Sequence, residues 1–302
     1  MEKQLGLLPD LSDDLRARPE RIGKTQVGYR QVKAILNKAS GFLSGYDFSL
    51  NPYAGCSFGC TYCYAIRFSG REDAETSWGQ WVDVKENAIS LMRKIPAGKL
   101  DGKRIYMSSV TDPYQSVERR VQLTRSLLEV LAEKHAPLLV VQTRSPDVVR
   151  DIDLFGEIEA RGGRVQINMT VTTDDEGVRR VFEPGCPSNA VRLKAIADVH
   201  AAGLQSCITM TPLLPVADAD GFADSLARTG VSRFIIQPFH TGQAQFAAGT
   251  RQMAMSLMAE RFGGDKGDVV RQHQRHYEVV KSALTRWLGD IGEGRDGFAP
   301  PF

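Results

Sequence analysis

The stretch RIYMSSVTDPYQSVERRVQLTRSLLEVLAEKHAPLLVVQT (104–143) decides the fold class. It begins with a short apolar run, continues with the helical pattern VQLTRSLLEVLAEK (121–134) and ends with a second β-rich run at 137–143. Two strands joined by a helix of this length form a βαβ unit, in which the strands lie parallel in one sheet. The segment therefore predicts a parallel α/β fold.

The same alternation continues on both sides of this stretch. With 104–110 and 137–143, we expect six strands, the other four lying at 46–53, 164–171, 204–211 and 233–239. Helical patterns occupy 84–95, 145–163, 188–203, 218–228 and 269–290. Six strands with helical cover predict a partial (β/α)6 barrel of the TIM type, and a doubly wound open sheet is the alternative. We expect a peripheral N-terminal arm (1–45), the partial barrel (46–240) and a C-terminal helical extension (241–302).

Two of the expected strands alternate polar and apolar residues. Gln166, Asn168, Thr170 and Thr172 share one face of the first, and Gln205, Cys207, Thr209 and Thr211 share one face of the second. An ordinary buried parallel strand is apolar on both faces. The pattern predicts a polar barrel interior that holds a ligand, and an edge strand is the alternative interpretation.

Composition sets limits on function and location. The 38 Lys and Arg residues nearly balance 36 Asp and Glu, so the net charge of +2 argues against nucleic-acid binding by bulk charge alone. No apolar run is long enough for a transmembrane helix, and the N-terminal residues do not follow the pattern of a signal peptide. We expect a soluble cytoplasmic protein. Five cysteines are too few, and odd in number, for a disulfide framework.

Three of the cysteines lie together in NPYAGCSFGCTYCYA (51–65). Cys56, Cys60 and Cys63 have the spacing C-x3-C-x2-C, and thiolates select zinc, copper(I) or iron–sulfur clusters. Structural zinc needs four ligands, whereas a four-iron cluster held by three cysteines leaves one iron for a ligand that is not protein. A zinc site completed by a distant residue, in a binding protein without catalysis, stays as the alternative.

With Tyr62 before its third cysteine, this segment resembles the cluster loop of radical S-adenosylmethionine (radical SAM) enzymes. Three later segments resemble, in order, the spore photoproduct lyase-like branch, often described as DNA repair photolyase. They are SSVTDPYQ (108–115), TRSPDVVRDIDLF (143–155) and VTTDDEGVRRVFEPGCPS (171–188), with Arg192 following. The resemblance extends over about residues 47–240.

The resemblance implies a radical SAM enzyme with one [4Fe-4S] cluster and one S-adenosylmethionine site. Cys56, Cys60 and Cys63 become the cluster ligands, and the open iron binds the amino and carboxylate groups of S-adenosylmethionine. Reductive cleavage then gives a 5′-deoxyadenosyl radical that abstracts hydrogen from a substrate. An electron donor such as flavodoxin or ferredoxin is implied as a partner. Cys186 and Cys207 cannot supply a second cluster by themselves.

The resemblance also implies residues that contact S-adenosylmethionine. Tyr62 and Thr211 are expected near the adenine, and Asn168 and Thr170 at the ribose. The methionyl amine and carboxylate are assigned to the ends of two strands, at Ser108, Ser109, Thr111 and Asp112 and at Thr143, Arg144 and Ser145. Glu183 and Arg192 flank the EPGCPS turn. The alternatives are structural: Tyr62 as part of the loop core, Asp112 and Thr111 in an ordinary turn, Arg144 as a surface cation, and Glu183 with Arg192 as a salt bridge.

The substrate stays open between two classes. Spore photoproduct lyases return a hydrogen atom from a cysteine near the end of the second strand, but IYMSSVTDPY (105–114) contains no cysteine. Cys207 is a candidate hydrogen donor, and an inert buried thiol is its alternative. The substrate is either a nucleic acid, or a small metabolite or peptide in a biosynthetic pathway. His135, His200, His273 and His276 fall in helical surface patterns, and His240 follows the sixth strand.

Overall fold

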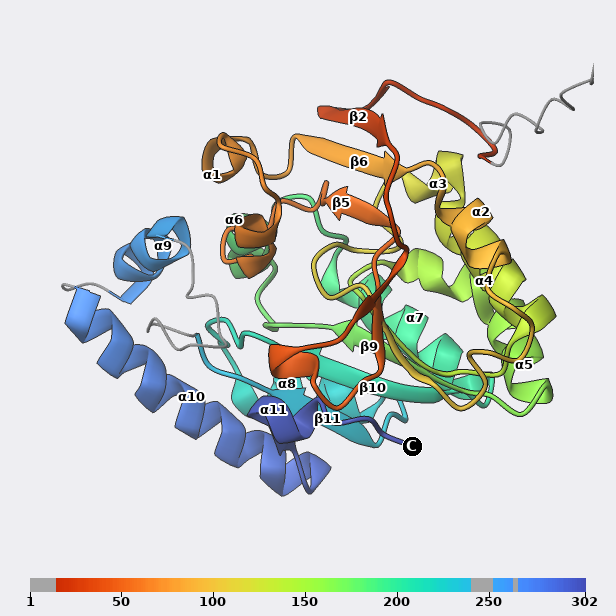
Figure 1. Ribbon diagram of the computed structural model, residues 1–302. Coiled ribbons are helices and arrows are strands. Elements are labelled where there is room, and N and C mark those ends of the chain that lie inside the picture. Colours follow the sequence, from red (N-terminus) through yellow and green to blue (C-terminus); the bar gives the residue numbers. More distant parts are fainter. Residues whose placement is uncertain (1–14, 240–251, 263–265) are drawn as a thin grey trace, which may run out of the picture.

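The computed structural model describes residues 15–239, 252–262 and 266–302. Its main feature is an eight-stranded sheet with the order β12-β11-β10-β9-β8-β7-β4-β3. Six of these strands are parallel to one another: β4 (Phe48–Leu50), β7 (Arg104–Met107), β8 (Leu138–Thr143), β9 (Arg164–Thr170), β10 (Gln205–Met210) and β11 (Arg233–Ile236). β12 (Gly292–Glu293) extends the sheet beyond β11, and β3 (Leu36–Lys38) pairs antiparallel with β4. The predicted α/β fold with a partial six-stranded barrel is confirmed, and Figure 1 shows the curved sheet below the centre of the view.

Helices cover the outer side of this sheet (Figure 1). They are α2 (Ala88–Arg93), α4 (Leu123–Lys134), α5 (Ile152–Ala160), α7 (Asn189–Ala201) and α8 (Ala219–Ala227). Three short helical segments, α3 (Glu118–Val121), the 3-10 helix η4 (Pro146–Asp151) and α6 (Glu176–Phe182), precede α4, α5 and α7. In α4, Leu123, Leu127 and Leu131 recur at the helical spacing and are fully buried. Their apolar stripe packs with Val141 and Val165 in one hydrophobic core.

The inner face of the sheet is polar, as the alternation of residues predicted. Gln142 Nε2 donates to Thr170 Oγ1 at 2.7 Å and to Thr209 Oγ1 at 3.0 Å. Asn168 Nδ2 donates to Gln142 Oε1 at 3.2 Å. The side chains of Thr170, Thr209 and Asn168 are buried, so these hydrogen bonds satisfy groups that would otherwise be costly to bury.

A second sheet, which the sequence did not predict, lies beside the barrel (Figure 1). Its order is β1-β2-β6-β5, formed by β1 (Arg21–Ile22), β2 (Thr25–Arg30), β6 (Trp81–Lys85) and β5 (Tyr53–Gly55). The helix expected over 84–95 is therefore wrong at its start, because Val84 and Lys85 belong to β6 and α2 begins only at Ala88. The strand expected over 46–53 is divided between β4 and β5. The domain boundaries at 45 and 240 stay predictions.

The amino ends of the barrel strands are closed by two segments that are distant in sequence. η2 (Gly41–Leu43) carries Phe42, whose ring meets Phe298 edge-on at 5.4 Å. Phe298 follows α11 (Gly294–Gly297) and belongs to one hydrophobic cluster with Cys207, Tyr46 and other residues. These aromatic side chains close that end of the barrel.

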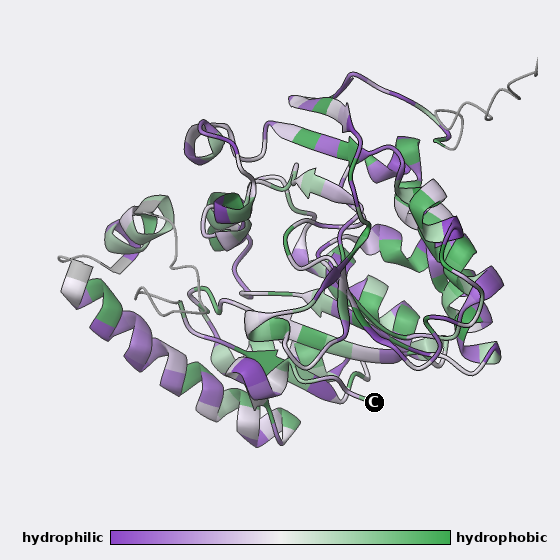
Figure 2. Cartoon of the chain, in the orientation of Figure 1, coloured by the Kyte–Doolittle hydropathy of each residue, from purple (hydrophilic) through white to green (hydrophobic). Residues whose placement is uncertain are grey.

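Two further helices, α9 (Gln252–Phe262) and α10 (Lys266–Leu288), follow the barrel. α10 overlaps the helix expected over 269–290, but it begins three residues earlier and ends two residues earlier. α10 packs against α8 and alternates apolar and strongly polar positions (Figure 2). Among the described residues, no helix combines the length and apolar character needed to cross a membrane.

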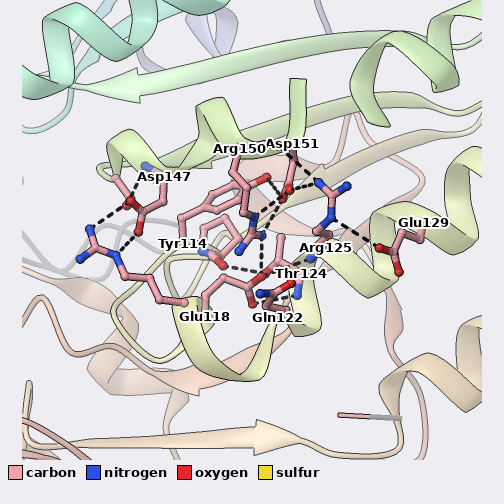
Figure 3. A network of polar contacts seen from close by, with 12 residues as sticks. Tyr114, Glu118, Gln122, Thr124, Arg125, Glu129, Asp147, Arg150 and Asp151 are labelled. Atoms are coloured by element: carbon pink, nitrogen blue, oxygen red, sulfur yellow. Dashed lines mark hydrogen bonds and ion pairs between the residues drawn. The ribbon is translucent and has the colours of Figure 1, made fainter. Parts of the chain in front are cut away.

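A network of charged side chains, here called the Glu118 network, is buried between α3, α4 and η4 (Figure 3). Glu118 is fully buried and accepts hydrogen bonds from the Tyr53 hydroxyl, from the Thr124 and Arg125 backbone amides at 2.9 and 3.2 Å, and from Arg150 Nη2 at 2.7 Å. Asp151 is also fully buried and accepts from Arg125 Nη1 at 2.7 Å and from the Tyr114 hydroxyl at 3.0 Å. The network joins the turns after β7 and β8 to the helices outside them.

Candidate functional site

The cysteine loop follows β5 and lies against the carboxyl ends of the barrel strands. Thr111 Oγ1, after β7, donates to the Gly55 carbonyl at 2.6 Å, and the Tyr64 hydroxyl donates to the Ser109 carbonyl. Gly55 has φ +75°, and a Cβ there would lie 2.6 Å from the Trp81 ring. The chain therefore needs glycine at the entrance to the loop.

The three cysteines of the loop lie close to one another. Cys56 and Cys60 are buried, and Cys63 is half-buried. Burial raises the pKa of the Cys56 thiol well above its usual value, and the nearby Asp112, Cys60 and Cys63 raise it further. Among the described residues, no three His, Cys, Asp or Glu side chains are grouped to hold one metal ion. An iron–sulfur cluster does not require such a group, because each thiolate binds a different iron atom. Three neighbouring thiols at the carboxyl end of the strands fit that kind of group.

A second charged network, here called the Glu183 network, lies beside the cysteine loop. Glu183 is fully buried and accepts hydrogen bonds from the Tyr62 hydroxyl and from Thr172 Oγ1, the latter at 2.9 Å. Arg144 Nη2 donates to the Tyr62 hydroxyl at 3.2 Å. Arg192 Nη2 lies 2.6 Å from Glu183 Oε2. The salt bridge considered for Glu183 and Arg192 is therefore present.

Electrostatics in this network favour the charged form of Glu183. Burial would raise the pKa of this carboxyl, but the Arg192 and Arg144 guanidinium groups outweigh it and lower the pKa to about 2. Three buried atoms nevertheless lack a hydrogen-bond partner: Arg144 Nε, Arg192 Nη2 and Glu183 Oε2. The close contact of Arg192 with Glu183 is thus an ion pair without hydrogen-bond geometry. Unpartnered polar atoms are uncommon in protein interiors and need an explanation.

Tyr62 and Arg144 are part of this network and are not surface groups. The Tyr62 ring is buried and packs edge-on against Phe239, with centroids 6.1 Å apart. Arg144, expected to be a surface cation if it had no role at the site, has a side chain only 20% exposed, and it points at Tyr62 and Glu183. Their contacts with S-adenosylmethionine stay predictions.

Asp112 holds the turn after β7 against the end of β8. Its carboxylate accepts from Thr143 Oγ1 and from the Arg144 amide, both at 2.8 Å, and from the Tyr114 amide at 2.9 Å. Ser145 caps η4 by accepting from the Asp147 amide at 3.3 Å. The turn interpretation of Asp112 describes these contacts, and a direct contact with a methionyl amine stays a prediction.

Ser108 directly follows β7 and has an unusual backbone conformation. Its φ is +73°, which costs energy for a residue other than glycine. Its hydroxyl is buried and lacks a hydrogen-bond partner. Strain and an unpartnered group at the end of a barrel strand are the features expected where a ligand binds.

The remaining predicted residues lie on the inner face of β9 and β10 or at its end. Asn168 and Thr170 are engaged in the polar network of the barrel interior. Thr211 is half-buried directly after β10. Cys207 is fully buried among aromatic side chains near the closed end, in a different hydrophobic cluster from the cysteine loop.

The contact of one cysteine and the burial of two histidines could not be recognised from the sequence. Cys186, to which the sequence assigned no role, has its Sγ 3.6 Å from that of Cys60. His135 and His273, expected at the surface, are buried, and His273 Nε2 accepts from the Phe239 amide at 3.2 Å. His240 lies outside the described residues. The segment EPGCPS (183–188) contains a single cysteine, so it has no spacing that could indicate a role for Cys186. Its contact with Cys60 joins residues 126 positions apart, and no local pattern reveals it.

Comparison with solved structures gives the same fold. A variant of spore photoproduct lyase superimposes with a TM-score of 0.60 at 13% identity, over 94% of this chain and 88% of that one. Another variant, with bound AdoMet and dinucleoside spore photoproduct, gives 0.56 at 15% identity, over 89% and 81% of the two chains. At these identities the likeness establishes the fold.

Comparison with other sequences identifies relatives and a family. An uncharacterized protein of Methanocaldococcus jannaschii is 34% identical over 173 residues, covering 57% of this chain and 62% of that protein. An uncharacterized protein of Mycobacterium tuberculosis is 29% identical over 203 residues, covering 64% and 58%. The matches thus span about three-fifths of these relatives. Because residues 50–228, more than half of the chain, match the Radical SAM superfamily model, this chain belongs to the radical SAM superfamily.

Proposed function

We propose that this protein is a radical SAM enzyme of the spore photoproduct lyase-like kind. Members of the superfamily are enzymes, and the family implies a [4Fe-4S] cluster and S-adenosylmethionine. The observation that carries the proposal is the position of Cys56, Cys60 and Cys63 beside the Glu183 network, at the carboxyl ends of parallel strands. Functional residues of α/β barrels collect at that end.

Each part of the site has a distinct task in this proposal. Cys56, Cys60 and Cys63 hold the cluster. When bound, the cluster and S-adenosylmethionine supply an electron and a 5′-deoxyadenosyl radical for hydrogen abstraction. Arg144, whose side chain is only 20% exposed and whose buried Nε has no hydrogen-bond partner, orients the methionyl carboxylate. The Ser108 hydroxyl offers a further hydrogen bond to the bound molecule.

The closed end of the barrel protects the reaction. Phe42 and Phe298 close the amino ends of the strands, so water enters the interior less readily from that side. Cys207 is the candidate hydrogen donor on the inner face of β10. Its burial raises the pKa of the thiol to about 12, which keeps the S–H bond intact at neutral pH.

Two substrate classes are in question. The shared fold with spore photoproduct lyase supports a nucleic-acid substrate. The net charge of +2 and the serines after β7, where the branch has a cysteine, support a small metabolite or peptide. Binding to a damaged oligonucleotide that weakens steeply with salt would favour the first class. A flavodoxin or ferredoxin is the electron donor in either case.

Anaerobic reconstitution with iron and sulfide tests the proposal. We expect a brown protein with about four irons, as the family implies, that forms 5′-deoxyadenosine from S-adenosylmethionine when a reductant is added. A colourless protein that binds zinc in stoichiometric amount would instead support the zinc-stabilised binding protein. Deuterium transfer from a candidate substrate into 5′-deoxyadenosine would then identify the substrate.

A further inference from the structure

Cys186 lies against one of the proposed cluster ligands. Its Sγ is 3.6 Å from Cys60 Sγ, within hydrogen-bond distance for sulfur, and both side chains are buried. Cys186 belongs to the turn between α6 and α7, so the contact joins residues 126 positions apart. The radical SAM reaction as proposed above gives this residue no task.

The turn is fixed against the cysteine loop by several backbone contacts. The Gly185 amide donates to the Phe58 carbonyl at 3.0 Å, and the Thr61 amide donates to the Phe182 carbonyl at 2.9 Å. A Cβ on Gly185 would lie 2.6 Å from the Ser57 carbonyl oxygen, so the two segments touch directly. Arg179 Nη1 donates to the Cys186 carbonyl at 2.7 Å. These contacts fix the turn that carries Cys186 against the loop that carries Cys60, so the two sulfur atoms are held close together.

The direction of the hydrogen bond follows from the chemistry of a cluster ligand. Cysteine binds iron as a thiolate, so Cys60 then has no proton to donate and can only accept. Cys186 Sγ lies within hydrogen-bond distance of Cys60 Sγ at 3.6 Å, so a hydrogen bond between the two needs Cys186 as its donor. Cys186 is thus the donor and Cys60 the acceptor.

We propose that Cys186 donates a hydrogen bond to the Cys60 thiolate and thereby raises the reduction potential of the cluster. Hydrogen bonds to cluster sulfurs are one way in which proteins set this potential. Reduction adds negative charge, which a donor beside the thiolate stabilises. The inference rests on the proposed function, because it requires a cluster at Cys60, and it makes Cys186 a positioning residue and not a ligand.

The test compares Cys186→Ala with Cys186→Ser in reconstituted full-length protein. The midpoint potential is measured by redox titration followed by electron paramagnetic resonance, without S-adenosylmethionine. Loss of one ordinary hydrogen bond changes the reduction equilibrium up to about tenfold, equivalent to about 59 mV for one electron. We expect a potential more negative by up to this amount in Cys186→Ala, and a smaller shift in Cys186→Ser, which keeps a donor.

Cys207→Ala is the matched control, because it removes another buried thiol from a different hydrophobic cluster. Its potential should equal that of the unaltered protein. Equal potentials in Cys186→Ala and the unaltered protein would overturn the inference. Loss of iron in both Cys186 variants would also overturn it, because Cys186 would then be a ligand. If the unaltered protein assembles no cluster, the proposed function itself fails, and this result is distinguishable from the other two.

Discussion

The Glu118 and Glu183 networks are alike in composition and differ in how completely they are paired. Each contains a fully buried glutamate, two arginines and a tyrosine hydroxyl that donates to that glutamate. No side-chain atom of the Glu118 network is buried without a partner in the described structure (Figure 3). In the Glu183 network three buried atoms make no hydrogen bond. Arg192 Nη2 and Glu183 Oε2 contact each other at 2.6 Å as an ion pair, and Arg144 Nε lies 3.7 Å from Glu183 Oε1.

This difference separates a structural role from a functional one. A fully paired network offers nothing to a ligand and serves to hold turns and helices together. A buried donor without a hydrogen bond beside a candidate cluster loop, such as Arg144 Nε, can be satisfied when a polar molecule binds there. Burial and charge alone would have marked both networks as candidate sites.

The largest effect is expected at the cysteine loop. Cys60→Ala removes one of three thiolates, so reconstituted protein should contain much less iron and form no 5′-deoxyadenosine above the background without protein. Unfolding of the cluster-free protein in urea, measured under reducing conditions, should change little. A variant that still turns over S-adenosylmethionine would argue against the loop as the cluster site.

The next effect concerns stability and belongs to the Glu118 network. Glu118→Ala leaves the Tyr53 hydroxyl and two backbone amides without their acceptor, and it leaves Arg150 with fewer partners. Breaking a buried pair on one side costs about 3–5 kcal/mol. Urea unfolding should reveal this loss, while the dependence of 5′-deoxyadenosine formation on S-adenosylmethionine in the folded fraction stays unchanged. A changed dependence would contradict the structural role.

Arg144→Ala should behave in the opposite way to Glu118→Ala, with a changed dependence of turnover on S-adenosylmethionine as its main effect. A hydrogen-bonded contact to a carboxylate contributes about 1.5–3 kcal/mol, so its loss should raise the S-adenosylmethionine concentration for half-maximal turnover about tenfold to a hundredfold. Iron content should stay unchanged. Arg125→Ala in the Glu118 network is the matched control and should lower the melting temperature without this kinetic change. Equal kinetics in the two variants would remove the assignment of Arg144.

The smallest effect is a difference in the pH dependence of stability. The pKa of Glu183 is lowered to about 2, so its contribution is present above the ordinary pKa of about 4.3 and is lost as the pH falls toward 2. Burial raises the pKa of Glu118, so that group favours the folded state more as the pH falls through its folded pKa. Urea unfolding of Glu183→Gln and Glu118→Gln against pH, relative to the unaltered protein, should give slopes of opposite sign. Slopes of the same sign would contradict this difference.

Local patterns in the sequence predicted the parallel strands, the covering helices and the cysteine loop. Each depends on residues close together in the chain, such as the period of α4 or the spacing of Cys56, Cys60 and Cys63. The small sheet was missed because β6 takes its strand conformation from pairing with β2, more than fifty residues earlier. The hydrogen bond from Tyr62 to Glu183 joins residues 121 positions apart, and no local pattern reveals such a contact.

The outer strands of the eight-stranded sheet also affect how copies of the chain behave toward each other. β3 and β12 form the two edges and have only three and two residues, and both come from segments outside the βα repeat. Short edge strands offer few free backbone groups to a neighbouring chain, so they reduce edge-to-edge aggregation. Without them, the longer β11 would form an edge on one side and β4 on the other. The segments that flank the repeat therefore also help to keep copies of the protein apart.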